Sequence, residues 1–86
     1  MANRRKNDGP EKTIRLGNVS ASVFVNETSN NGNGTNEFRS ITVQRSYRDD
    51  KDNTRYDTSF TARDLPAAIR CLQLAQEYVE QQDVLV

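Results

Sequence analysis

The sequence contains no histidine, no tryptophan and a single cysteine, Cys71, in 86 residues. Histidine is the side chain that most often moves protons near neutral pH, so its absence argues against general acid–base catalysis. One thiol can form neither an internal disulfide nor a zinc site, and no Cys/His or Ser/His pair is present to activate a nucleophile. We therefore expect no enzyme activity, no metal or other cofactor, and no small-molecule substrate.

Long hydrophobic runs are also missing. Hydrophobic residues make up 34% of the chain, and no apolar stretch approaches the roughly 20 residues that a membrane-spanning helix needs. With no apolar leader and only one cysteine, the expected location is the cytoplasm, without membrane contact. A domain of this size buries a small share of its surface, which favours association with a partner subunit.

Alternation of apolar and polar residues predicts four strands. They are expected over about residues 12–16, 19–27, 37–48 and 54–62. Between them lie a Gly-Asn turn, a polar loop over residues 28–36 and an Asp-rich turn over residues 49–53. The Asp-rich turn does not fit a calcium loop, because it lacks the glycine and the glutamate that such a loop requires.

The spacing of apolar residues becomes helical over residues 63–82, with Asp64 as the expected N-cap and Pro66 in the first turn. One apolar stripe, expected to pack on the sheet, contains Leu65, Ala68, Ile69, Leu72, Ala75 and Val79. A second, adjacent stripe would need another partner, and we expect that partner to be a second copy of the chain. The expected dimer interface is Cys71, Leu74, Ala75 and Tyr78; the alternative is that Leu74 and Tyr78 stay half-exposed in a monomer.

These elements predict an α+β fold in which a four-stranded antiparallel β-meander is followed by one C-terminal α-helix, in the order ββββα. We expect a basic, disordered arm over residues 1–11, a single domain over 12–83 and a short tail over 84–86.

Charge is balanced overall but not along the chain. Residues 1–48 hold 8 basic and 4 acidic residues, whereas residues 49–86 hold 4 basic and 8 acidic residues. Such asymmetry is typical of a polyanion-binding face, although two oppositely charged halves can also attract each other within a fold or a dimer.

Basic and aromatic residues alternate along the predicted strands and their connecting turn. Single-stranded nucleic acid is bound by a basic groove that follows the backbone and by flat rings on which bases stack. The candidate residues for this chemistry are Arg15, Phe24, Arg39, Arg45, Tyr47, Arg48, Lys51 and Arg55. The alternative is that the arginines pair with the aspartates of the next turn and that the helix or a partner covers Phe24.

The stretches GNVSASVF, QRSYRDDKDN, SF and DLPAA form a pattern over residues 12–82. This pattern resembles a group of small, mostly uncharacterised bacterial proteins, and the order of elements is similar to that of the transcriptional coactivator PC4 and the Whirly proteins. The resemblance implies a unit that dimerises through its helix and binds single-stranded DNA, in preference to RNA, on a curved sheet.

Two classes of function therefore stay open. The first is a dimeric, PC4-like protein that binds single-stranded nucleic acid. The second is a protein–protein interaction or assembly module, in which Phe24 and Tyr47 contact a partner. Arginines gathered on one concave face would favour the first class, whereas dispersed arginines and a flat apolar patch would favour the second.

Overall fold

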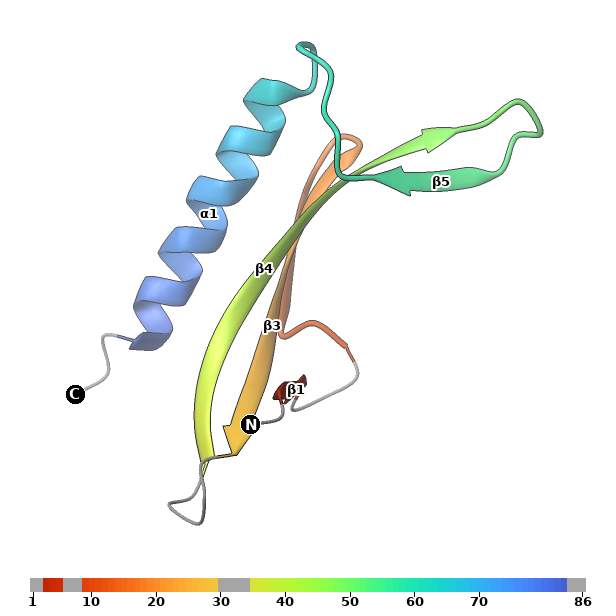
Figure 1. The fold of residues 1–86 in the computed structure, drawn as a ribbon. Coiled ribbons are helices and arrows are strands. Elements are labelled where there is room, and N and C mark those ends of the chain that lie inside the picture. The colour runs from red at the N-terminus through yellow and green to blue at the C-terminus, as the bar shows by residue number, and fades with distance from the viewer. Residues whose placement is uncertain (1–2, 6–8, 30–34, 84–86) are drawn as a thin grey trace.

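The computed structural model describes residues 3–5, 9–29 and 35–83, which form one antiparallel sheet and one helix (Figure 1). The elements are β1 (Asn3–Arg5), β2 (Lys12–Leu16), β3 (Val19–Ser29), β4 (Thr35–Arg48), β5 (Thr54–Asp57) and α1 (Leu65–Asp83). Strands β2 to β5 pair in chain order, and α1 follows them. The predicted α+β fold with a ββββα meander is thus confirmed.

The hairpins follow from local turn chemistry. Leu16 pairs with Val19, so Gly17 and Asn18 alone connect β2 to β3. Gly17 has a φ of 62°, which a residue with a Cβ atom rarely adopts. The long β3–β4 hairpin runs in continuous register from Val19 opposite Arg45 to Ser29 opposite Thr35. Part of the predicted loop over 28–36 is therefore strand, and residues 30–34 lie outside the described residues.

Two further differences from the expected elements occur at the ends of the sheet. The arm expected to be disordered contains β1, whose Asn3 pairs with Thr28 of β3; the rest of residues 1–8 and the tail over 84–86 lie outside the described residues. Strand β5 stops at Asp57, well before residue 62. The Asp57 side chain accepts a hydrogen bond from the Ser59 N–H at 3.1 Å, a local turn that ends the strand.

Helix α1 begins where the sequence predicts it. The carbonyl of Asp64 accepts the first helical hydrogen bond from the N–H of Ala68 at 3.0 Å, and the Asp64 carboxylate accepts a bond from the Thr61 hydroxyl at 2.9 Å. Pro66 lies in the first turn, where its missing N–H leaves no helical bond unmade.

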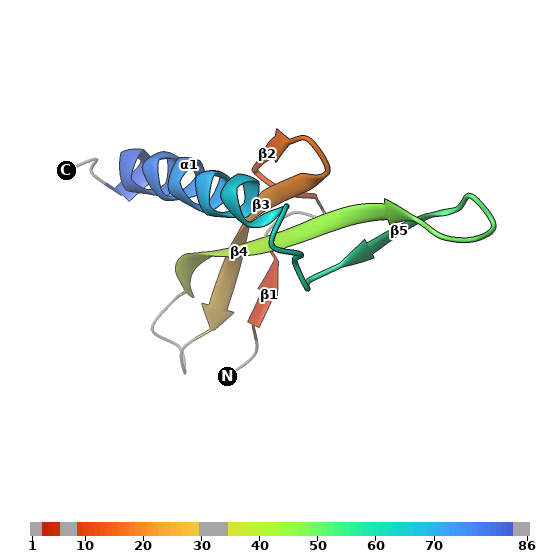
Figure 2. The ribbon, with the colours of Figure 1, turned by 90° about the horizontal axis from the view of Figure 1, so that it is seen from above.

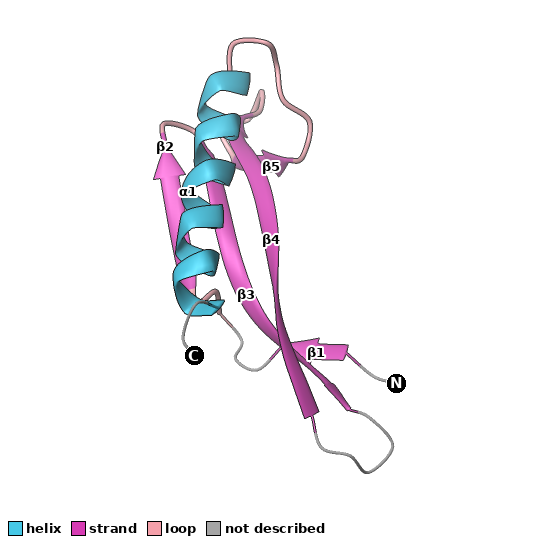
Figure 3. Ribbon diagram, turned by 90° about the vertical axis from the view of Figure 1, so that its left-hand side faces the viewer, coloured by secondary structure: helices cyan, strands magenta, loops and turns pink. Residues whose placement is uncertain are grey.

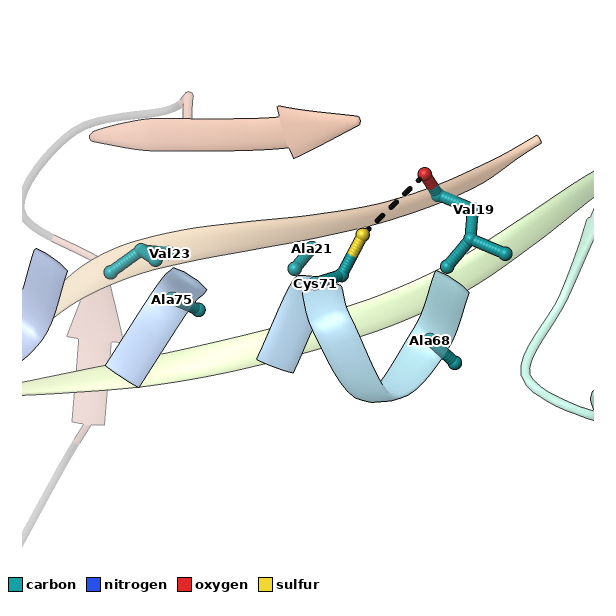
Figure 4. Packing of buried hydrophobic residues seen from close by; sticks show 6 residues of the cluster. All are labelled: Val19, Ala21, Val23, Ala68, Cys71 and Ala75. Carbon is teal, nitrogen blue, oxygen red and sulfur yellow. Dashed lines mark hydrogen bonds between the residues drawn. The ribbon is translucent and has the colours of Figure 1, made fainter. Parts of the chain in front are cut away.

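The core lies between β3 and α1 and is made of small residues (Figure 4). Val19, Ala21 and Val23 of β3 face Ala68, Cys71 and Ala75 of α1, and all six are buried. The Cys71 sulfur lies within hydrogen-bond distance of the carbonyls of Ile14, at 3.9 Å, and Val19, at 3.8 Å, so its single S–H donates to one of them at a time. Small side chains let the helix approach the sheet closely. The helix face that carries them is therefore the face that packs on the sheet.

Helix α1 covers one side of the sheet, above β2 and β3, and no described element covers the other side (Figures 2 and 3). The molecule extends 51 × 29 × 17 Å, and the shortest of these extents leaves room for only two layers. Within the described ranges, no helix is both long and apolar enough to cross a bilayer.

Candidate functional site

The register of the sheet assigns each strand residue to one of two faces. Residues directly opposite each other in antiparallel strands lie on the same face, and alternate residues of one strand lie on opposite faces. Because Val19 is buried under α1, its partners Leu16 and Arg45 also lie on that side, which we call the helix face. We call the other side the open face; its residues include Thr13, Arg15, Ser20, Ser22, Phe24, Asn26, Phe38, Ser40, Thr42, Gln44, Ser46, Arg48 and Tyr56.

The open face contains no carboxylate on any described strand. The strand carboxylates are Glu27, Glu37 and Asp57, and the register places all three on the helix face. On β2 to β5, the open face instead combines hydroxyl and amide side chains with three aromatic rings and two arginines. Asn26 holds part of this surface in place, since its amide nitrogen donates a hydrogen bond to the Ser40 hydroxyl at 2.9 Å.

The open face therefore brings together three of the eight predicted binding residues, Arg15, Phe24 and Arg48. Arg15 is exposed and has no ion-pair partner among the described residues. Arg48 pairs with Asp52 at 3.1 Å, but both side chains are largely exposed, so this pair is weak and competes little with a phosphate. Phe24 is half-buried between Ser22 and Asn26 along the strand and lies opposite Ser40.

Four other predicted binding residues, Arg39, Arg45, Tyr47 and Arg55, lie on the helix face. Arg45 is the most engaged of them. Its guanidinium donates to the Ser59 carbonyl at 2.8 Å and pairs with Asp57 at 3.3 Å and Asp64 at 3.9 Å. It also lies 5.1 Å from the centroid of the Tyr47 ring. Arg45 thus ties β4 to β5 and to the start of α1, which is a structural role.

The remaining basic residues on this side also have local partners. Arg39 forms two hydrogen bonds with the Glu11 carboxylate, at 2.7 and 3.1 Å. Arg55 donates to Asp49 at 2.8 Å. The eighth candidate, Lys51, is exposed in the β4–β5 turn, beyond the end of the sheet. Pairing with the aspartates of the turn thus occurs for Arg55 and, weakly, for Arg48. Arg39 and Arg45 pair with carboxylates elsewhere in the chain.

The Asp-rich turn is organised by Asp49. Its carboxylate accepts hydrogen bonds from the backbone N–H groups of Lys51 at 3.0 Å and Asn53 at 2.9 Å, as well as from Arg55. The Arg55 bond and these N–H groups lower the pKa of Asp49 below its ordinary value. Asp52 has a φ of 65°, which closes the turn. These carboxylates are used to build a turn, and no cluster of metal-ligating residues occurs among the described residues.

The helix residues expected at a dimer interface lie mostly against the chain's own sheet. Cys71 and Ala75 are 0% and 1% exposed, and Leu74 and Tyr78 are half-buried. The packing face combines Ala68 and Ala75 from one predicted stripe with Cys71 from the other. The large apolar residues that the sequence places on the sheet are instead exposed: Leu65 by 47%, Ile69 by 53% and Leu72 by 49%.

An apolar groove of about 360 Å³ lies between α1 and β4. Its walls are Ile41, Leu72, Ala75, Gln76, Val79 and Glu80. Ile41 is 39% exposed on the helix face of β4 and was not among the residues predicted to form a site. The sequence did contain a signal for this groove. The small residues along α1 mark the face that packs on the sheet, and Leu72 lies outside that face.

Comparison of the chain with protein-family models, with curated proteins and with solved structures returns no match. The open face and the groove beside β4 are its two candidate binding surfaces.

Proposed function

We propose that the chain binds single-stranded nucleic acid, DNA in preference to RNA, on the open face of its sheet, and that it does so as a dimer. One observation carries the proposal: this face presents arginines and aromatic rings but no strand carboxylate, although the whole chain is neutral. A surface without carboxylates does not repel a phosphate backbone, and its rings offer stacking platforms.

The roles follow from the positions of the side chains. Arg15 and Arg48 contact phosphates, with Lys51 adding charge beyond the end of β4. Phe24 stacks on a base, and the exposed rings of Phe38 and Tyr56 extend the platform. Arg48 lies eight residues along β4 from Ser40, the partner of Phe24, which corresponds to about 27 Å along the strand. This distance accommodates several nucleotides of an extended strand.

Single strands are the better ligand for a chemical reason. The rings can stack only on bases that are not already stacked in a duplex. The hydroxyl and amide groups between them offer hydrogen bonds to any base, so strong sequence preference is not expected. Affinity is moderate, because few cations are available and the turn carboxylates lie close to Arg48.

The test is a titration of fluorescently labelled oligo-dT, oligo-rU and a DNA duplex, each at two salt concentrations. We expect oligo-dT to bind more tightly than oligo-rU and the duplex. Its affinity should fall with salt by a log–log slope of about −0.7 for each phosphate contact. Tighter binding of the duplex, or no oligo-dT binding at low salt, would overturn the proposal.

A specific observation favours the second function, a protein-interaction module. Several arginines are dispersed and paired on the helix face, and Leu65, Ile69 and Leu72 form an exposed apolar patch beside the groove. The two functions use different surfaces, so one chain can have both.

A further inference from the structure

The outer edge of β4 is incompletely paired. β3 has neighbours on both sides, with β4 on one side and β1 and β2 on the other. β4 pairs with β3 from Thr35 to Arg45, but β5 pairs only with residues Arg45 to Arg48. Among the described residues, no strand lies on the outer side of residues 40–44 (Figure 3).

Two hydrogen bonds show which backbone groups point outward. The N–H of Ser46 donates to the Asn18 carbonyl, on the β3 side, at 2.8 Å. The N–H of Asp49 donates to Asn53, on the β5 side, at 3.0 Å. Successive residues of a strand direct their backbone groups to opposite sides. Ile41 and Val43 therefore present their N–H and C=O groups to the outer edge.

This edge has none of the usual features that prevent strand addition. Residues 40–44, with the sequence SITVQ, contain no proline, no glycine and no charge. Their register with β3 is continuous, without a bulge. Natural sheets protect exposed edges with charges, prolines or bulges, because an unprotected edge is a template for another strand. An uncharged edge of this kind fits an uncharged strand.

We propose that a second copy of this chain pairs with this edge, β4 against β4 in antiparallel register, around a two-fold axis at Ile41. The register is self-complementary. Ile41 then faces Ile41 of the second copy, Ser40 faces its Thr42 and Arg39 faces its Val43, so that apolar meets apolar at the axis and hydroxyl meets hydroxyl beside it. The pairing ends at Phe38 opposite Gln44, because β5 occupies the edge from Arg45 onward, and residues 35–37 of each copy must bend away from the other copy's β5. The assembly stops at two copies, because a two-fold interface uses the same edge of both copies and leaves no second β4 edge exposed.

The groove beside β4 supports the same occupant. With α1 above β2 and β3 in each copy, the two helices are separated by at least three strand spacings, or about 14 Å. Direct helix packing needs about 8–10 Å. The two helices therefore leave a space between them, above the paired β4 strands. The side chains of Ile41, Leu72 and Val79 of both copies meet in this space. The pairing thus covers the groove and accounts for two large apolar residues, Ile41 and Leu72, that a monomer leaves exposed.

The first experiment measures mass by sedimentation from micromolar to millimolar concentration. The wild-type chain should double its mass of 9.8 kDa as concentration rises. Ile41→Lys places a charge on the edge and should weaken the dimer at least tenfold. Ile69→Lys, the same change at an exposed position outside the groove, should have little effect. A monomer at all concentrations, or a dimer that Ile69→Lys breaks and Ile41→Lys does not, would overturn the proposal.

The second experiment is disulfide trapping, which reports the register. In an outward-bonded pair at the two-fold axis, the two Cα atoms of residue 41 lie about 5.5 Å apart, within the range that a disulfide bridges. Ile41→Cys should therefore form a covalent dimer under mild oxidation. Gln44→Cys is the control, since the two copies of residue 44 lie about 20 Å apart along the strands. Equal trapping at both positions, or none at residue 41, contradicts this register.

These readouts are independent of nucleic acid. If oligo-dT does not bind but Ile41→Cys still cross-links, the proposed function fails while the edge pairing stands. If oligo-dT binds to a chain that remains a monomer, the edge pairing and the dimer fail while nucleic-acid binding stands.

Discussion

On β3, neighbouring residues have opposite surroundings. Val23 is enclosed between the sheet and α1, whereas Phe24 points to the side that no described element covers. Charged side chains on the helix face pair with each other within the chain, as Arg45 does with Asp57. The open face carries arginines but no strand carboxylates. One side of the same strands therefore maintains the fold, and the other remains available for a ligand.

The largest expected effect comes from placing a carboxylate on each face. Val23→Asp buries an unpaired charge in the core and should cost more than about 4 kcal/mol, enough to unfold a small domain. Ser22→Asp, one residue away, should fold with a melting temperature within a few degrees of wild type, yet bind oligo-dT more weakly. Circular dichroism melts and anisotropy titrations measure the two effects. A well-folded Val23→Asp variant would show that the faces have been assigned the wrong way round.

A second comparison uses aromatic rings. Phe24→Ala removes a ring from the open face and should reduce oligo-dT affinity by about 1–3 kcal/mol, with little change in the salt slope. Tyr47→Ala removes a ring from the helix face, where Tyr47 is 40% exposed, and should leave affinity unchanged. Equal losses for both variants would mean that the two faces do not differ in stacking.

A third comparison uses arginines. Arg45→Ala should lower the free energy of unfolding by about 1–2 kcal/mol, because it removes the hydrogen bond to the Ser59 carbonyl and the cation that pairs with two carboxylates. Its salt slope for oligo-dT should not change. Arg15→Ala should leave stability unchanged and reduce the salt slope by about one phosphate contact. Denaturant unfolding and salt titrations of the same two proteins give both quantities, and a reversed pattern would contradict the assignment.

The smallest effect is a pH dependence of the β4–β5 turn. The Arg55 bond and the backbone N–H bonds hold the pKa of Asp49 below its ordinary value of 3.8, so the charged form is favoured in the folded state. Its stabilising contribution is present above pH 3.8 and is lost as the pH falls through the lower, folded-state value.

The amide signals of Lys51 and Asn53 should therefore shift as the solution is acidified from about pH 6 to about pH 2, while core signals stay unchanged. The Asp49→Asn variant is the control and should lack this transition. If its turn signals titrate like those of the wild type, another group is responsible.

Much of this fold was predictable because strands and helices have different hydrophobic periods. Alternation within each strand identified Val19, Ala21 and Val23 as a shared face, and the turn at Gly17 and the start of α1 were also predicted. The sequence alone did not show which residues of different strands share a face. That depends on register across the β3–β4 loop, and a shift of one residue would have moved Arg45 to the open face.

The choice of helix face depended on packing distance, which hydrophobicity alone does not encode. Leu65, Ile69 and Leu72 are the more hydrophobic residues, so their stripe was expected on the sheet. Ala68, Cys71 and Ala75 pack there instead, because short side chains allow close contact with Val19 and Val23. For the same reason the exposed apolar residues beside β4 were not foreseen.

The burial of Cys71 gives the chain an internal reporter of its own unfolding. The thiol is 0% exposed, and loss of hydration raises its pKa above the ordinary value, so the reactive thiolate is both rare and shielded in the folded state. A thiol reagent then modifies the wild-type chain only when α1 lifts from β3. The labelling rate measures this opening without any engineered probe, and the label, once attached, no longer fits beneath the helix.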